Sequence, residues 1–282
     1  MFNAERFVAA ALTSLLVQSF TDFRLLISDN ASTDGTREII KELTKGDSRV
    51  EYTRNAENVG ALANFGAVFE KADSPYFMWA AADDLWEPGF VQSMVANLRE
   101  DARRTLSFCA YDTVDDDTRP IRVYERHARL AVPTGRLGRL HQLLWFPEEY
   151  GKASLIYGLM VTESARRVGG VRTYSANQAG LDHLMVFRLA GEGPIAVAPS
   201  VLYHKRHLIQ RDRRWSRANQ LAARFPQIDP VPRTYLEDYR RLLPRIPLTA
   251  RERLVLRVSL EVRIAWNDAL HLAKRSYQVA RK

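Results

Sequence analysis

The spacing of apolar residues predicts that the chain opens with a helix that faces the core. The stretch from Phe7 to Thr21 contains no charged residue. Two interleaved series at four-residue spacing form one helix face: Phe7, Ala11 and Leu15; Val8, Leu12 and Leu16. Glu5 accompanies Arg6 ahead of this stretch, so it lacks the positive leader of an export signal. We therefore expect a buried helix, with Asn3 as its N-cap.

Strands and helices are then predicted to alternate. The pattern predicts strands at 25–27, 50–53, 76–80 and 106–111, and helices at 36–43, 60–71 and from Pro88 onward. This alternation predicts right-handed crossovers and a mainly parallel α/β sheet. Ligands of such sheets lie beyond the carboxyl ends of the strands. Asp29 and the pair Asp83-Asp84 fall at two of these ends.

The second half of the chain has a weaker pattern. Residues 112–147, with the acidic run Asp115-Asp116-Asp117, are predicted to form an irregular connection or a lid. A helix is expected over 179–190 and a strand over 195–203. Residues 254–266 alternate like a strand, but Thr249 and Glu252 form a capping box and the run is long for a strand. A helix is favoured there.

Composition limits the class of protein. With 282 residues, of which 46% are hydrophobic, the chain can bury a sizeable core and is not mostly disordered. The single cysteine, Cys109, excludes an intramolecular disulfide and a multi-cysteine metal site. No stretch reaches the roughly 18 uncharged apolar residues of a membrane-spanning helix. A cytoplasmic protein is expected, either free or peripheral at the inner face of the membrane.

The net charge of +8 is unevenly distributed. Residues 205–282 carry 19 Lys/Arg and 7 Asp/Glu, whereas residues 1–204 carry 22 and 26. A basic tail suggests either nucleic acid or an anionic membrane as partner, with a solvated surface as the alternative. No nucleic-acid recognition motif accompanies the tail, so no nucleic-acid partner is expected.

The tail has the composition of an interfacial helix. Four arginines alternate there with Leu, Val, Ile and Trp266: Arg251, Arg253, Arg257 and Arg263. This mixture is typical of amphipathic helices that lie on anionic lipid. Packing of the same helix onto the preceding domain is an equal alternative.

The adjacent carboxylates Asp83 and Asp84 suit a divalent cation. Mg²⁺ and Mn²⁺ prefer carboxylate oxygens, commonly one or two from the protein together with phosphate oxygens. An Asp-Asp pair alone is a weak signal, because many solvated loops contain one.

A larger set of motifs resembles the inverting family 2 glycosyltransferases of the GT-A fold. The motifs are Ser28-Asp29-Asn30-Ala31-Ser32-Thr33-Asp34-Gly35-Thr36, Asn58-Val59-Gly60-Ala61, Trp79-Ala80-Ala81-Ala82-Asp83-Asp84-Leu85-Trp86-Glu87-Pro88, Gly169-Gly170, Asp182 and Lys205-Arg206-His207. The resemblance covers roughly residues 2–210. It implies a GT-A domain over 1–210, a Rossmann-like sheet flanked by helices, followed by a basic helical extension over 211–282.

The resemblance also implies roles on the donor side of the site. Asp29 would bind the nucleotide base, and Asp83 would contact the ribose or assist the metal. Asn3, Asn58 and Gly60 would belong to the nucleotide pocket. For Asp29, capping of the following helix is the alternative.

The remaining implied roles concern the metal and the acceptor. Asp84 would bind Mg²⁺ or Mn²⁺, with His207 beside the diphosphate. Asp182 would be the general base, and Gly169-Gly170 would face the acceptor. The alternatives are an ordinary acid at a helix N-terminus for Asp182, a basic surface loop for His207, and a simple turn for the glycines.

Two departures from the family pattern stand out. Ala81 occupies the place of the first acid in the commonest Asp-x-Asp form. Met1-Phe2-Asn3 lies in the turn that follows the family's first β-strand, so we expect the natural protein to extend upstream and to contribute that strand.

Two function classes follow from the sequence. The first is a metal-dependent transferase that moves a sugar from a nucleoside-diphosphate sugar to a glycan, a lipid-linked molecule or a small acceptor. The second is a catalytically impaired nucleotide-sugar-binding or interaction protein.

Overall fold

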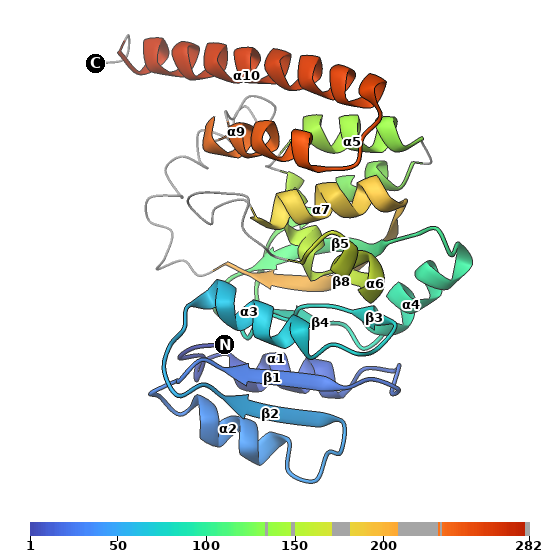
Figure 1. The fold of residues 1–282 in the computed structure, drawn as a ribbon. Coiled ribbons are helices and arrows are strands. Elements are labelled where there is room, and N and C mark those ends of the chain that lie inside the picture. Colours follow the sequence, from blue (N-terminus) through green and yellow to red (C-terminus); the bar gives the residue numbers. More distant parts are fainter. Residues whose placement is uncertain (133–134, 148–149, 171–180, 208–230, 232, 280–282) are drawn as a thin grey trace.

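The computed structural model has a mixed α/β architecture in layers (Figure 1). It describes residues 1–132, 135–147, 150–170, 181–207, 231 and 233–279. The predicted domain boundary near residue 210 lies outside these residues, so the division into 1–210 and 211–282 stays a prediction.

Helices and strands alternate through most of the chain. The helices are α1 (Val8–Leu16), α2 (Thr36–Leu43), α3 (Ala61–Glu70), α4 (Phe90–Glu100), α5 (Arg136–Trp145), α6 (Thr162–Arg167), α7 (Leu181–Glu192), α9 (Arg233–Leu242) and α10 (Ala250–Val279). The strands are β1 (Leu25–Asp29), β2 (Val50–Arg54), β3 (Tyr76–Phe77), β4 (Leu85–Trp86), β5 (Leu106–Val114), β6 (Pro120–Tyr124), β7 (Leu159–Val161) and β8 (Ile195–Arg206). Short 3-10 turns are η1 (Arg126–Ala131), η3 (Lys152–Tyr157) and η5 (Leu243–Arg245).

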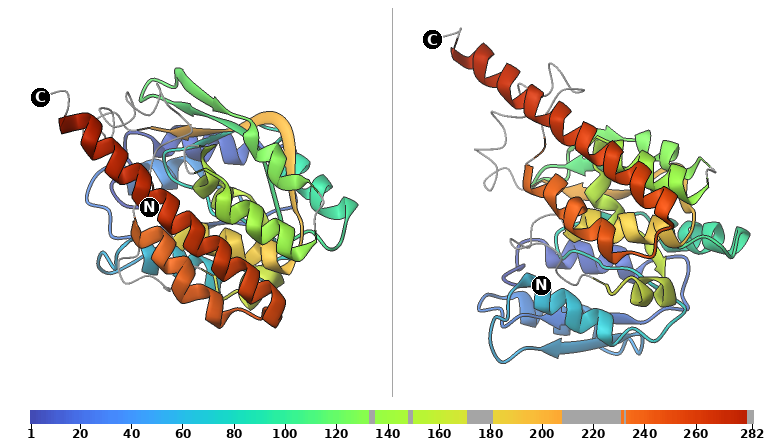
Figure 2. Two further views of the ribbon diagram at one scale, coloured as in Figure 1. Left: turned by 90° about the horizontal axis from the view of Figure 1, so that it is seen from above. Right: turned by 45° about the horizontal axis from the view of Figure 1, so that its top comes forward.

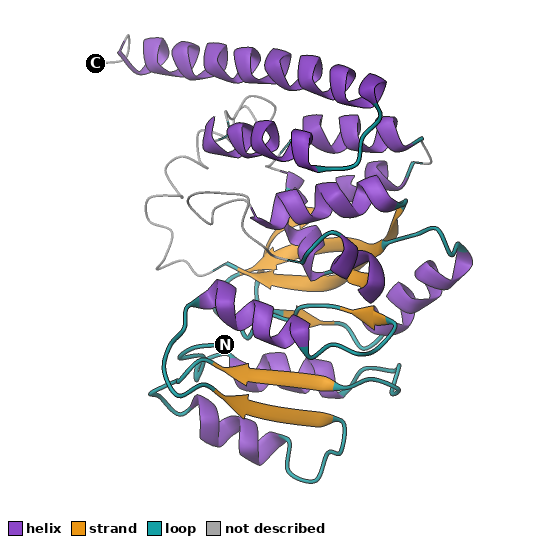
Figure 3. Cartoon of the chain, in the orientation of Figure 1, coloured by secondary structure: helices purple, strands orange, loops and turns teal. Residues whose placement is uncertain are grey.

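The strands form two sheets (Figure 3). β1 and β2 pair in parallel, with Ile27 opposite Tyr52. The larger sheet has the order β3-β7-β5-β8-β4, and β6 pairs with β5. Only β5 and β8 run parallel in that larger sheet, as far as it is described. The prediction of a mainly parallel sheet is therefore wrong for this larger sheet, where most pairings are antiparallel. The sequence did not indicate β3, β4 and β7, because strands of two or three residues are too short to leave a periodic signal.

Several predicted boundaries need correction. The strand expected over 76–80 ends at Phe77, and Asp83-Asp84 come before the unpredicted strand β4. Most of the described part of 112–147 is regular: β5 continues to Val114, a turn at Asp115-Asp116-Asp117 leads into β6, and α5 follows further along. This hairpin is poor in apolar alternation because β6 is exposed on most of its positions.

The N-terminal helix is confirmed, but its cap is not. Val8, Ala11, Leu12 and Leu15 are buried in α1, as the spacing predicts. Asn3 is not the N-cap, since the helix begins after Phe7 and no side chain caps it. The backbone of Met1 instead joins the end of β1, where its amino group donates to Ser28 O at 2.7 Å.

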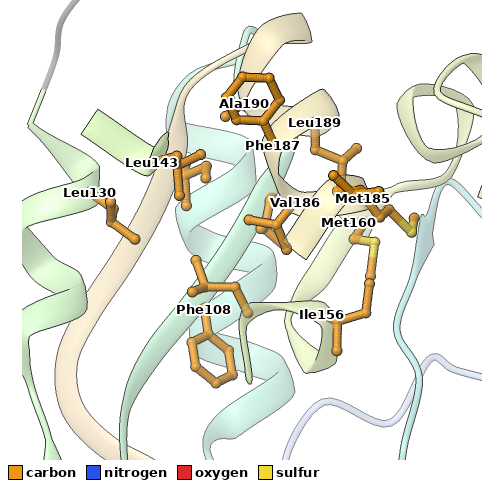
Figure 4. Close-up of a cluster of buried hydrophobic side chains, with 14 of the residues drawn as sticks. Phe108, Leu130, Leu143, Ile156, Met160, Met185, Val186, Phe187, Leu189 and Ala190 are labelled. Carbon is orange, nitrogen blue, oxygen red and sulfur yellow. The ribbon is translucent and has the colours of Figure 1, made fainter. Parts of the chain in front are cut away.

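The main core lies between the larger sheet and α7 (Figure 4). β5 is buried along its whole length, and Phe108 on it is fully enclosed. From the other side α7 contributes Val186, Phe187 and Leu189, each with less than 1% of its surface exposed. α7 is apolar nearly all round because α5 and η3 cover it on other sides.

The C-terminal helices pack on this core rather than standing apart from it. α10 lies over α9 and α5, at the end of the molecule farthest from β1 and β2 (Figures 1 and 2). Leu256, Leu260 and Ile264 belong to the main hydrophobic cluster. The capping box is confirmed: Thr249 N donates to Glu252 Oε2 at 2.9 Å and Glu252 N to Thr249 Oγ1 at 3.2 Å.

Truncation of Leu260 tests this packing. We expect Leu260→Ala to lower the free energy of unfolding by about 3 kcal/mol, because it leaves a cavity in a buried contact. Val258→Ala, on the exposed face of the same helix, should change it by no more than about 0.5 kcal/mol. Urea denaturation followed by circular dichroism measures both. Equal effects of the two substitutions would contradict the packing.

Candidate active site

The site is built around the turn that carries Asp83 and Asp84, between β3 and β4. Asp84 is 3% exposed, and both of its carboxylate oxygens accept hydrogen bonds. Its Oδ1 accepts from Arg206 N at 2.8 Å, and its Oδ2 accepts from the Tyr203 hydroxyl. β8 therefore holds this carboxylate in place along the β4–β8 pairing.

Burial raises the pKa of Asp84 to about 6. Loss of hydration is the largest cause, and the neighbouring charge of Asp83 adds to it. Lys205 and the hydrogen bonds from Tyr203 and Arg206 act in the opposite direction but do not cancel it. A bound cation or another positive charge near this carboxylate would therefore favour its ionised form.

Arg206 ties this turn to the rest of the site. The residue is 6% exposed, and its guanidinium Nε donates to Asp83 O at 2.9 Å. Its Nη1 donates to the carbonyl oxygens of Asp115 and Asp116 at 2.7 and 2.9 Å. The same group lies 4.7 Å from the centre of the Phe7 ring, just ahead of α1. One side chain thus joins three segments that are far apart in sequence.

Tyr157, at the end of η3, lies near enough to three predicted site carboxylates to feel their charge. Burial raises the pKa of its hydroxyl, and the charges of Asp84, Asp182 and Asp83 add to this effect. Lys205 Nζ lies 4.7 Å from the ring centre. Because side chains alternate along β8, Lys205 faces this side while Arg206 faces the β5–β6 turn.

Asp182 lies in the first turn of α7 and can be reached from solvent. Its side chain is 38% exposed, and its Oδ1 accepts a hydrogen bond from His183 N at 2.8 Å. The helix N-terminus favours a negative charge at this position. Both the predicted base and its alternative, an ordinary helix-terminal acid, are compatible with this placement, so the role stays a prediction.

Asp29, predicted to bind the base, is completely buried. Its Oδ1 accepts from Ser32 N at 2.9 Å and its Oδ2 from the Tyr52 hydroxyl at 2.8 Å. Burial raises the pKa of this carboxyl, but the bonds from Ser32 and Tyr52 and the charge of Arg54 outweigh it, so the pKa is lowered. In this structure Asp29 organises the turn after β1. A direct contact with a base stays a prediction.

The other residues predicted to belong to the nucleotide pocket are held in place by hydrogen bonds. Asn30 Nδ2 donates to Asn58 Oδ1 at 2.7 Å, and the same oxygen accepts from Gly60 N at 2.9 Å. Gly60 precedes α3 with φ +85°, a conformation that favours glycine. Asn3 Oδ1 accepts from Thr33 N at 2.9 Å, which places Asn3 beside the turn after β1.

Gly169 and Gly170 end α6. Their φ angles are +80° and +58°, and Gly170 N donates a hydrogen bond to Ala165 O at 2.9 Å. This is a C-cap in which the chain leaves the helix through the left-handed region of backbone conformation. A side chain at Gly170 would meet the Phe69 ring. This supports the turn alternative. The expected contact with an acceptor is untested, and residues 171–180, which follow, are outside the described part.

The predicted metal ligands are Asp84 and His207, with Asp83 assisting; His207 lies one residue beyond β8. Among the described residues no group of three or more His, Cys, Asp or Glu side chains gathers in a metal-binding arrangement. Two carboxylates nevertheless fit Mg²⁺ or Mn²⁺, which take their remaining ligands from phosphate and water. His207 N donates to Val114 O at 2.8 Å, which fixes its backbone at the end of β5.

Comparison with known proteins identifies the family. The sequence profile of Glycosyl transferase family 2 matches residues 1–158, more than half of the chain. The chain belongs to this family. The predicted resemblance is therefore confirmed.

Individual relatives of this family 2 glycosyltransferase are distant. A Bacillus subtilis protein named for teichuronic acid biosynthesis, TuaG, is 28% identical over 120 residues, which cover 43% of this chain and 47% of TuaG. The Escherichia coli UDP-Glc:alpha-D-GlcNAc-diphosphoundecaprenol beta-1,3-glucosyltransferase WfgD is 31% identical over 85 residues, covering 30% of this chain and 33% of WfgD. The chain spans about half or less of the length of these relatives.

Solved structures confirm the GT-A fold. TarS 1–349 of S. aureus, in complex with UDP, superposes with a TM-score of 0.62 at 14% identity, over 90% of this chain and 66% of that one. The mannosyltransferase PcManGT of Pyrobaculum calidifontis, in complex with GDP-Man and Mn²⁺, gives 0.58 at 14% identity, over 98% and 73%.

Sequence reasoning missed some residues of this family 2 site. Tyr157 and Tyr203 have no motif of their own, and Lys205 stands in the motif Lys205-Arg206-His207 without a predicted role. His204 also escaped notice: its Nδ1 lies 2.7 Å from Asp112 Oδ1 and its Nε2 3.0 Å from Glu87 Oε1. The alternation along β8, which separates Lys205 from Arg206, was the available signal.

The pKa of Asp84 predicts a pH-dependent stability. A carboxyl whose pKa is raised in the folded state contributes stability that is fully present when the pH is below 3.8, the pKa in the unfolded chain. This contribution is lost as the pH rises through about 6, the pKa in the folded protein. Asp84→Asn keeps the shape of the side chain without the charge: its Oδ1 can still accept from Arg206 N, and its Nδ2 can donate to the Tyr203 hydroxyl. Between pH 4 and 7.5 the wild type should therefore lose roughly 2.5 kcal/mol of unfolding free energy relative to Asp84→Asn.

Chemical denaturation across this pH range measures the difference, with the exposed Asp117→Asn as the matched control. Asp117→Asn should follow the wild type. Parallel pH profiles for wild type and Asp84→Asn would mean that Asp84 ionises freely in the folded protein.

Proposed function

We propose that the protein moves a sugar from a nucleoside-diphosphate sugar to a hydroxyl group of an acceptor, with inversion at the anomeric carbon. The observation that carries this proposal is the surroundings of Tyr157. Its hydroxyl is near enough to Asp84, Asp182 and Asp83 for their charges to raise its pKa, and Lys205 Nζ lies 4.7 Å from the centre of its ring. A candidate base and a candidate diphosphate-binding group thus belong to one region of the molecule.

The chemistry requires these separate roles. In an inverting transfer the acceptor oxygen bonds to the anomeric carbon while the bond from that carbon to the diphosphate oxygen breaks, and the bonding electrons leave with the diphosphate. Asp182 would accept the acceptor's hydroxyl proton in that step. Its 38% exposed side chain leaves it accessible to an incoming hydroxyl group.

The departing diphosphate gains negative charge, so positive charge must be near it. Lys205 carries a positive charge near Asp84 and Tyr157, and its ammonium group would bind the phosphates. Asp83 and Asp84 would hold Mg²⁺ or Mn²⁺, which would neutralise the leaving group when bound. The presence of Mn²⁺ with GDP-Man in PcManGT supports this assignment.

Relatives suggest the substrate classes. TarS binds UDP and UDP-GlcNAc, and PcManGT binds GDP-Man, which favours a nucleoside-diphosphate sugar as donor. WfgD takes a diphosphoundecaprenol-linked acceptor, which supports a lipid-linked acceptor in the synthesis of a cell-envelope polysaccharide.

Replacement of Asp182 tests the proposed base. We expect Asp182→Asn to lower the rate of sugar transfer about 100- to 10,000-fold, because the amide cannot accept the proton. Binding of the donor, measured by calorimetry with Mn²⁺, should remain within about threefold of wild type, since the amide conserves the shape of the site.

Asp117→Asn, in an exposed turn, is the matched control and should retain full transfer. Wild-type transfer by Asp182→Asn would remove the base assignment. If the wild type binds the donor but transfers sugar to no acceptor offered, the alternative of a catalytically impaired nucleotide-sugar-binding protein is favoured instead.

A further inference from the structure

α10 has a second apolar face that points away from the protein. Leu254, Val258, Val262 and Trp266 recur every fourth residue and are 65%, 57%, 54% and 60% exposed. The opposite face, with Leu256 and Leu260, is buried against the neighbouring helices. A helix packed on one side of a soluble domain needs only one apolar face. The exposed row, which we call the α10 strip, therefore requires its own explanation.

Arginine side chains outnumber acidic ones in the region of the α10 strip. Residues 233–273, whose side chains the structure describes, contain 8 Lys/Arg and 5 Asp/Glu. The acidic residues nearest the strip are engaged internally: Glu261 pairs with Arg240 at 2.5 Å, and Asp268 pairs with Arg233 at 3.2 Å, both on α9. Arg251 and Arg257, by contrast, are exposed on α10 itself. The surface around the strip thus carries excess positive charge.

These features fit a lipid surface better than a second copy of the chain. A stable protein dimer buries about 800 Å² on each partner, and one row of side chains on one helix supplies only part of that. Two copies would also bring like charges together. An anionic bilayer accepts the apolar row among its acyl chains and attracts the arginines beside it. Trp266 is of the residue type enriched at the membrane–water boundary.

We propose that the α10 strip docks the protein on an anionic membrane surface, with α10 lying in the plane of the interface. Among the described residues no helix combines the length and apolar character needed to cross a bilayer, so the contact would be peripheral. α10 lies at the end of the molecule opposite β1 and β2, with α7 and the larger sheet between (Figure 1). Docking would leave the nucleotide-side strands away from the lipid.

Co-sedimentation with vesicles tests the docking. The full chain should pellet with vesicles of phosphatidylcholine and phosphatidylglycerol, and far less with phosphatidylcholine alone. The triple substitution Val258→Gln, Val262→Gln, Trp266→Gln should lower the partition coefficient about tenfold or more. The matched control Ile121→Gln, Val123→Gln removes exposed apolar side chains from β6 and should bind like wild type.

A charge variant completes the design. Arg251→Gln, Arg257→Gln should weaken binding to the anionic vesicles and leave binding to neutral vesicles unchanged. Circular dichroism and thermal unfolding verify that each variant folds, which is expected because every substituted side chain is exposed. Donor binding serves as a separate readout, so loss of docking and failure of the transferase proposal are distinguishable.

Three results would overturn the proposal. The first is a wild-type chain that does not pellet with anionic vesicles. The second is equal pelleting by the triple variant. The third is a wild-type dimer, by sedimentation velocity, that the triple variant converts to monomer without any vesicle binding, which would assign the α10 strip to a second copy of the chain.

Discussion

The arrangement of the site depends on the burial of one guanidinium group. Arg206 ends β8 inside the protein, where its charge loses hydration and must be satisfied by hydrogen bonds. The carbonyl groups of Asp83, Asp115 and Asp116 provide them, and the ring of Phe7 covers the plane of the group. These contacts hold the Asp-Asp turn, the β5–β6 turn and the approach to α1 at fixed distances. The same strand places Tyr203 against Asp84 and Lys205 beside Tyr157.

Local patterns in the sequence predicted much of the fold. The four-residue spacing in α1, the capping box of α10 and the apolar run of β8 all led to the right elements, because each leaves a recognisable pattern within one segment of the sequence. The strands of two or three residues were missed, since they are defined only by pairing with distant partners. Asp83, Asp84 and Asp182 were predicted from family motifs, and their roles stay predictions. Tyr157 was not predicted, because only the folded chain brings its hydroxyl within the influence of these three charges.

The C-terminal region shows how two alternatives in the sequence can both have a structural basis. One face of α10 packs on α5 and α9, as the packing alternative required. The other face keeps the exposed apolar row that suggested a membrane in the first place.

The uneven distribution of charge along the sequence also corresponds to separate regions of the structure. The less basic first part of the chain contains the carboxylates of the site, while excess arginine collects around α9 and α10, away from the groups that would hold a metal and a diphosphate.

The central claim is that the Asp83-Asp84 turn and Lys205 form the binding site for a metal and a diphosphate. A crystal structure of the protein with a nucleoside diphosphate and Mn²⁺, recorded at the manganese absorption edge, tests it most directly. We expect an anomalous peak beside the carboxylates of Asp83 and Asp84, with the diphosphate between this peak and Lys205. A nucleotide bound with its phosphates elsewhere, or a manganese peak remote from both carboxylates, would contradict it.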